Sequence, residues 1–149
     1  MIVKIERGAS VINPEVIVRY AETTQEVERV IAILQSLDKK IRCHIGNEEK
    51  LVSAYDVYYF ESVDNQTFVY CESNVYKTES RIYKLAEELE HLGFVQISKS
   101  FLLNVNMLDS VRPLQNSRIE ATLKNGEKVY VTRKYLANIK RVLQEGGAV

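Results

Sequence analysis

The chain has 149 residues, of which 46% are hydrophobic and 27% charged, so its composition has no mark of disorder and fits one packed domain of ordinary size, alone or with a substantial extension. Its 20 basic and 20 acidic residues cancel, and bulk charge therefore gives no sign of a nucleic-acid or membrane-surface partner. The distribution is uneven, because residues 1–90 hold 11 basic and 16 acidic side chains and residues 91–149 hold 9 and 4. The excess of basic residues in the C-terminal part indicates an anionic partner for that part.

No apolar run approaches the roughly 18 residues that span a bilayer, and the first residues do not have the pattern of a signal peptide. We therefore expect a cytoplasmic protein. Cys43 and Cys71 form neither a C-x-x-C pair nor a disulfide framework, which suits a reducing compartment. We expect both to be small buried side chains.

The first 46 residues predict the order strand, strand, helix, strand. Residues 2–7 and 16–20 are rich in β-branched side chains and are separated by a turn-prone Asn-Pro-Glu. Thr23 with Glu26 has the spacing of a capping box and predicts a helix start. Alternation of apolar and polar residues over 41–45 predicts the third strand.

The next third of the chain predicts short β strands and one helix. Residues 51–62, 67–73 and 75–78 are rich in Tyr, Phe and Val and are separated by turn residues. Residues 80–93 then have helical periodicity, with Gly93 placed as the C-terminal stop. Connections this short predict antiparallel sheets.

An apolar segment follows over residues 94–104, and it is interrupted by Ser98, Lys99 and Ser100. This polar step is the place where the chain would leave the core and expose Lys99 before re-entering. Asn104 ends the segment, and we expect its amide to satisfy nearby backbone groups.

The C-terminal part predicts a hairpin and a final helix. Residues 109–114 are strand-like, and Pro113 favours an edge position. Residues 118–132 alternate around Asn125-Gly126, a pair that favours a type I′ turn. Residues 134–144 then have apolar side chains at helical spacing.

Enzyme motifs are absent from the sequence. The glycines support neither a P-loop nor a dinucleotide-binding motif, and His44 and His91 stand far apart without a cluster of ligands. Glu87, Glu88 and Glu90 fall on the polar side of the helix at 80–93. We therefore expect no catalytic residue, cofactor, metal site or small-molecule substrate.

The order of features from about residue 51 to 143 resembles the LytTR family of bacterial DNA-binding domains. The resemblance rests on an aromatic strand ending in Phe-Glu, a variable turn, a helix, a basic-Ser step before two aliphatics and Asn, and an Asn-Gly hairpin. These features are "YYFES" (58–62), "DNQT" (64–67), "RIYKLAEEL" (81–89), "FVQISKSFLLN" (94–104) and "LKNGEKVYVTRKY" (123–135).

The resemblance implies a mainly β (α+β) fold, in which small antiparallel sheets stack into an elongated sandwich and turns, not a helix, enter the major groove. It implies DNA contacts from the turn after the aromatic strand, from the basic-Ser step and from the Thr-Arg step. The matching residues are Asn65, Gln66, Thr67, Lys99, Ser100, Arg133 and Lys134.

Two details follow for these positions. Lys99 stands where the family often has Arg, and because lysine lacks the two-pronged donor geometry of arginine, it favours a phosphate over a base. Thr132 is a suitable N-cap for the last helix, so backbone N–H groups there are further candidates for a phosphate contact.

We expect residues 47–146 to form the LytTR-like domain and residues 1–46 to form a strand-strand-helix appendage. Receiver domains, which precede many domains of this family, need over 100 residues, so we expect that the appendage is not one and that the protein is not controlled by phosphorylation of an attached domain. We expect the appendage to form a homodimer contact or to dock an inhibitor, and the resemblance suggests a small membrane protein that restrains the regulator.

The sequence therefore favours a sequence-specific transcriptional regulator, without catalysis, that binds double-stranded DNA at paired direct repeats. Two alternatives stay open. In the first, the acidic half and the aromatic strands make a protein-interaction module, for which DNA binding is incidental. In the second, an enzyme gathers its catalytic groups from distant positions, which requires a pocket of titratable residues with perturbed pKa values.

Overall fold

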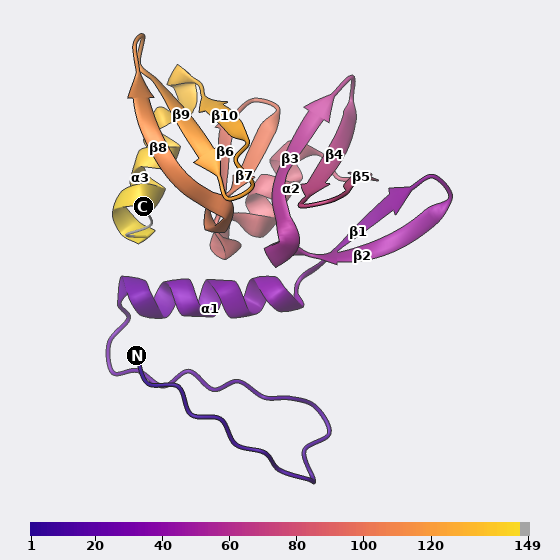
Figure 1. The fold of residues 1–149 in the computed structure, drawn as a ribbon, viewed down its shortest axis with the longest axis vertical. Coiled ribbons are helices and arrows are strands. Elements are labelled where there is room, and N and C mark those ends of the chain that lie inside the picture. Colours follow the sequence, from indigo (N-terminus) through magenta and orange to yellow (C-terminus); the bar gives the residue numbers. More distant parts are fainter. Residues whose placement is uncertain (147–149) are drawn as a thin grey trace.

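A computed structural model describes the backbone of residues 1–146 and shows a mainly β protein with two antiparallel sheets and three helices (Figure 1). The larger sheet has seven strands in the order β2-β1-β5-β4-β3-β7-β6, and the smaller has the order β10-β9-β8. The predicted fold class is confirmed. The strands are β1 (Lys40–Ile45), β2 (Glu48–Ser53), β3 (Val57–Val63), β4 (Gln66–Cys71), β5 (Val75–Thr78), β6 (Phe94–Ser98), β7 (Phe101–Asn104), β8 (Leu108–Leu114), β9 (Arg118–Leu123) and β10 (Lys128–Val131).

Strands β3, β6 and β7 of the seven-stranded sheet are buried on both faces, which explains their nearly continuous apolar residues, whereas β1, β2 and β5 keep one side exposed. One face packs against α2 (Ile82–Leu89), with Phe60 at the centre of that core. The other face packs against the smaller sheet and α3 (Leu136–Gly146), and Leu103 and Ile139 belong to this second core. The two sheets therefore form the expected sandwich, with one helix on its outer side.

Helix α1 (Gln25–Asp38) begins one residue later than the sequence indicated. Thr24, not Thr23, is its N-cap, and the Thr24 hydroxyl accepts a hydrogen bond from the Val27 backbone N–H at 3.2 Å. Glu26 is therefore not in the capping-box position that we predicted. Gly93 has φ of 95° and ends the helical segment after α2, as predicted.

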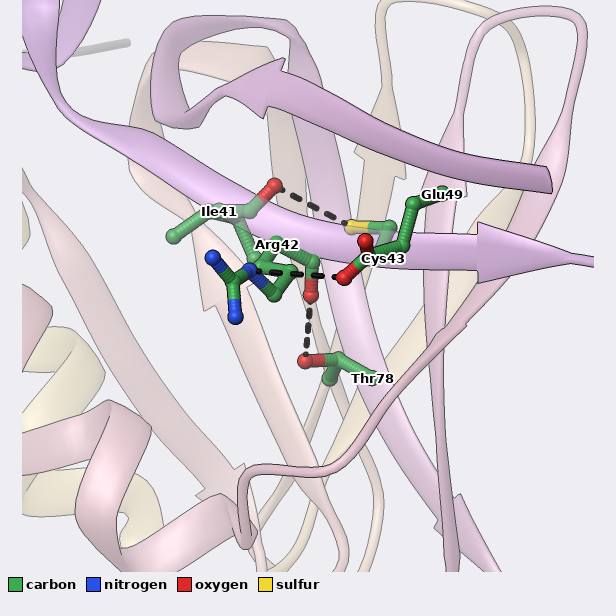
Figure 2. Close-up of polar contacts among 5 residues, drawn as sticks. All are labelled: Ile41, Arg42, Cys43, Glu49 and Thr78. Carbon is green, nitrogen blue, oxygen red and sulfur yellow. Dashed lines mark hydrogen bonds and ion pairs between the residues drawn. The ribbon is translucent and has the colours of Figure 1, made fainter.

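Strand β1 is part of the large sheet. It pairs along its whole length with β2, and on its other side His44 lies opposite Lys77 of β5. Figure 2 shows how β1 is attached to its neighbours: the Thr78 hydroxyl donates to the Arg42 carbonyl at 3.0 Å, and Arg42 Nε lies 3.5 Å from Glu49 Oε1. Residues on both sides of position 46 thus contribute to one sheet.

The two strands predicted over residues 2–7 and 16–20 do not form. Residues 1–24 contain no strand, and they run out from α1 and double back, away from the sheets (Figure 1). Their β-branched side chains favour an extended backbone, which they have, but a strand also needs a hydrogen-bonded neighbour. Residues 1–38 are therefore an extended segment followed by α1, with no strand pair, and β1 comes after them.

The predicted hairpin and the predicted edge strand both form, but the hairpin turn has a different geometry from the one expected. The hairpin around Asn125-Gly126 forms, but only Gly126 has positive φ, so the turn is not type I′, which needs positive φ at both central residues. Strand β8, which contains Pro113, is an edge strand as predicted. Among residues 1–146, no helix is long and apolar enough to cross a membrane.

Candidate nucleic-acid interface

The predicted contact residues lie in or directly after three turns, which the sheet pairing brings to one end of the sandwich. Glu61 of β3 pairs with Phe101 of β7, so the β3–β4 and β6–β7 turns are neighbours. The third turn follows β10 and leads into α3. Figure 1 shows the β3–β4 and β6–β7 turns at the end of the molecule opposite α1.

The β3–β4 turn presents an amide pair. Asp64 and Asn65 have φ of 51° and 62°, and this left-handed pair is the geometry of a tight hairpin turn that Asn and Asp tolerate. The side chains of Asn65 and Gln66 are exposed. Thr67 is only 4% exposed because it pairs with Ser62 on one side and with Thr78 on the other, so it presents less surface than its two neighbours.

The β6–β7 turn presents Lys99 and is held by three hydrogen bonds. The Ser62 N–H donates to the Ser100 carbonyl at 2.8 Å, and Gln96 Nε2 donates to the Lys99 carbonyl at 3.2 Å. The Ser100 N–H donates to Ser98 Oγ at 3.4 Å. The Lys99 side chain is exposed and Ser100 is half-buried. A charged side chain therefore stands on a turn whose backbone is held at both ends.

The third turn is attached to β6 through Thr132. Its backbone N–H donates to the Ile97 carbonyl at 3.1 Å, and its hydroxyl donates to the same oxygen at 3.4 Å. The sequence suggested that this hydroxyl caps the following helical segment. In the structure it does not cap the 3₁₀ turn Arg133–Tyr135. Because Ile97 is two residues before Lys99, this attachment places exposed Arg133 and Lys134 beside the β6–β7 turn.

Three further basic or titratable side chains border the β3–β4 turn, and the sequence reading missed them. His44, Lys77 and Arg81 line an open groove together with Asn65, Gln66 and Thr67. Arg81 Nη1 donates to the Asn65 carbonyl at 3.3 Å. Among the residues that the structure describes, neither Lys77 nor Arg81 has an ion-pair partner within 4.0 Å.

The sequence holds little sign of this cluster. His44 and Lys77 lie 33 positions apart and become neighbours only through the β1–β5 pairing. Arg81 immediately precedes α2 and lies within the segment 80–93 that the sequence predicted to be helical.

Asn104 has the structural role expected of it. Its side chain is fully buried, and Nδ2 donates to the Val57 carbonyl at 2.8 Å. Its Oδ1 accepts from the Asn106 N–H at 3.0 Å. Asn104 therefore joins β7 to β3 and starts the turn that leads to the smaller sheet.

The tyrosine side chains of β3 are also mainly packing residues. Tyr59 stacks between Tyr70 and Phe101, with ring centroids 4.3 and 4.4 Å away. Its hydroxyl donates to Glu127 Oε1 at 2.6 Å. Burial, together with the Glu127 carboxylate, raises the pKa of Tyr59, so the hydroxyl stays protonated.

The titratable groups of the described residues do not form a reactive centre. Burial raises the pKa of both the Cys43 and the Cys71 thiols to about 11, so neither is a thiolate at neutral pH. In the same residues, no group of three or more His, Cys, Asp or Glu has the arrangement of a metal site.

Comparison with known proteins gives a consistent picture. Residues 47–144 match the LytTr DNA-binding domain family model. The sensory transduction protein LytT of Bacillus cereus is 30% identical over 105 residues, which are 70% of this chain and 43% of LytT. A Staphylococcus aureus protein named as an uncharacterized HTH-type transcriptional regulator is 28% identical over 119 residues, 78% of this chain and 80% of that one.

A solved structure shares the fold. The LytTr DNA-binding domain of a protein described as a methyl-accepting/DNA response regulator from Bacillus cereus superposes with a TM-score of 0.66 at 23% identity. It covers 70% of this chain and 95% of its own. The chain spans less than half the length of LytT. The family model covers well over half of the 149 residues, and this chain belongs to the LytTR family of DNA-binding domains.

Proposed function

We propose that the protein is a sequence-specific transcriptional regulator that reads the major groove of double-stranded DNA through the three turns. The observation that carries this proposal is their convergence at one end of the sandwich. Six exposed or half-exposed polar residues are gathered there: Asn65, Gln66, Lys99, Ser100, Arg133 and Lys134.

The chemistry of these side chains suits base edges and phosphates. Arg133 can donate two hydrogen bonds to the O6 and N7 acceptors of guanine, and Asn65 or Gln66 can pair with adenine. Lys99 is a point charge and is assigned to a phosphate, with Ser100 beside it. The backbone bonds that hold each turn reduce the ordering cost of binding.

His44, Lys77 and Arg81 extend the same surface along the β3–β4 turn. Their N–H groups border a groove that also contains the turn amides and the Glu79 carboxylate. Within the described part of the chain, Lys77 and Arg81 have no ion pair to break before they meet a phosphate. We assign them to the DNA backbone flanking the bases that Asn65 contacts. Such contacts set orientation on the duplex without reading sequence.

The proposal includes paired binding sites. A single small domain reads few bases, and two copies at direct repeats on one side of the duplex would supply the missing specificity. A homodimer fits this arrangement, and the cytoplasm is where it would meet the chromosome. A small membrane protein that restrains the regulator remains part of the proposal through the family resemblance alone.

Arginine substitution tests the reading role. Arg133→Ala is expected to weaken binding to a selected DNA site by about 1–3 kcal/mol and to relax the preference at one base position. Lys99→Ala is expected to weaken all DNA similarly and to lower the salt slope by about one unit. Arg29→Ala is the matched control, because Arg29 is exposed on α1 at the opposite end.

The measurement is fluorescence anisotropy against fragments selected from genomic DNA, at several salt concentrations. If Arg133→Ala weakens specific and unrelated DNA equally, Arg133 is only a phosphate contact. If the unchanged protein shows no preference for any fragment at moderate salt, sequence-specific regulation is wrong and a protein-interaction module is favoured.

A further inference from the structure

The segment before α1 carries apolar surface that its own domain does not cover. We call residues 1–24 the arm. Ile5 and Ile12 are 92% and 94% exposed, and seven more large apolar side chains of the arm are at least half exposed. Scattered apolar residues on a surface are ordinary, but nine within 20 consecutive positions mark an interaction surface.

The arm is an open loop whose ends meet. The Met1 amino group lies 3.8 Å from Glu26 Oε1, so the start of the chain returns to the first turn of α1. The Val11 N–H donates to the Gly8 carbonyl at 3.1 Å and closes a turn. No residue of the arm lies in a strand, so both of its extended legs keep edges that can pair with another strand.

We propose that the arm binds a second copy of this chain, so that two arms pair edge to edge and bury their apolar side chains in a reciprocal, two-fold contact. The inference gives a physical form to the proposed homodimer and does not depend on DNA reading. In domain swapping, two identical chains exchange an element that lacks a partner in its own domain, and the arm has this property. Strand addition at an open edge supplies the hydrogen bonds.

Charge and size favour a second copy over an unrelated partner. The arm has three basic and three acidic side chains, so two arms do not repel each other and opposite charges can face across the contact. These charges are interspersed with apolar residues along both legs. A stable interface takes about 800 Å² and roughly 20–30 residues from each partner, and the 24-residue arm is of that size.

The position of the arm is compatible with DNA binding. It lies beyond α1, whereas the β3–β4 and β6–β7 turns lie at the far end of the sandwich (Figure 1). Residues 21–24 join the arm to α1 without helix or strand structure. Paired arms would therefore tether two domains and leave both reading surfaces free. They would not determine whether the two DNA repeats are direct or inverted.

Sedimentation velocity on the full chain tests the proposal, at protein concentrations from about 1 to 100 μM, a range that covers a micromolar dissociation constant. We expect a dimer for the unchanged chain and a monomer for the double variant Ile5→Asp and Ile17→Asp. Leu51→Asp is the control: Leu51 is 62% exposed on edge strand β2, outside the arm, and the dimer should persist.

Hydrogen exchange on the unchanged protein gives a second measurement that needs no variant. Amides of residues 2–7 and 16–20 should be protected at high concentration and lose protection on dilution. Unprotected arm amides in a dimer would overturn the proposal, as would a dimer that survives the arm substitutions. A monomer at every concentration would also overturn the proposal. Another protein, a membrane surface or nothing would then cover the arm.

The two proposals fail separately. The arm variant should bind a single DNA site as tightly as the unchanged monomeric unit, because its reading turns are untouched. Loss of DNA binding in a protein that still dimerises through the arm would count against the regulator and leave the arm contact standing.

Discussion

Asn104→Ala tests whether the asparagine that ends the β6–β7 segment is structural or binds DNA. The substitution removes the donor to the Val57 carbonyl and the acceptor for the Asn106 N–H, both made by a fully buried side chain. A buried polar group that is left without a partner costs about 1–3 kcal/mol. The substitution leaves two such groups, but Asn106 is only half-buried and water can bind its N–H, so we expect a total loss of roughly 2–4 kcal/mol.

Urea denaturation followed by circular dichroism measures this loss in the free energy of unfolding. Gln66→Ala is the matched control: it removes an exposed amide from the reading surface and should change stability by less than about 0.5 kcal/mol while weakening DNA binding. Folded Asn104→Ala should bind DNA normally once corrected for its unfolded fraction. A stability loss below about 1 kcal/mol would refute the two-bond account.

Two further predictions concern buried hydroxyl and thiol groups. Tyr59→Phe should lower the free energy of unfolding by about 1 kcal/mol, because it removes the hydrogen bond to Glu127 and leaves an exposed carboxylate that water can solvate; no change in the urea midpoint would contradict this. Cys43 should resist iodoacetamide in the folded protein, since a pKa raised from 9.0 to about 11 reduces the thiolate fraction about 100-fold at neutral pH. Equal labelling of Cys43 in native buffer and in urea, measured by mass spectrometry, would contradict this prediction. Because the folded state holds this proton more tightly, Cys43 contributes stability that is present below pH 9 and is lost as the pH rises towards 11.

Local patterns predicted the elements of the domain with good accuracy where the interaction partners are close in sequence. The helix after residue 81 ends at Gly93 because a left-handed residue is needed there, and that requirement is visible in the sequence. Pro113 likewise marks an edge strand by its missing N–H. Such features depend on one residue and its immediate backbone.

Predictions failed where the partner is distant or absent. The legs of the arm have the composition of strands, but strand formation depends on a neighbour, and none lies within the described chain. Thr132 had the chemistry of a helix cap, yet its hydroxyl donates to Ile97, 35 residues away. The low exposure of Thr67 was likewise not visible in the sequence, because it results from pairing on both sides of β4.

The sequence was sufficient to identify a LytTR-like domain and to predict which turn residues face DNA, because turn residues, apolar periodicity and the order of motifs are local properties. Tertiary structure decided which of those side chains share a surface. The β3–β7 register and the Thr132–Ile97 bonds bring the three turns together, and the β1–β5 pairing adds His44 to Lys77. Hydrogen bonds between distant strands set these proximities, and no single segment of the chain encodes them.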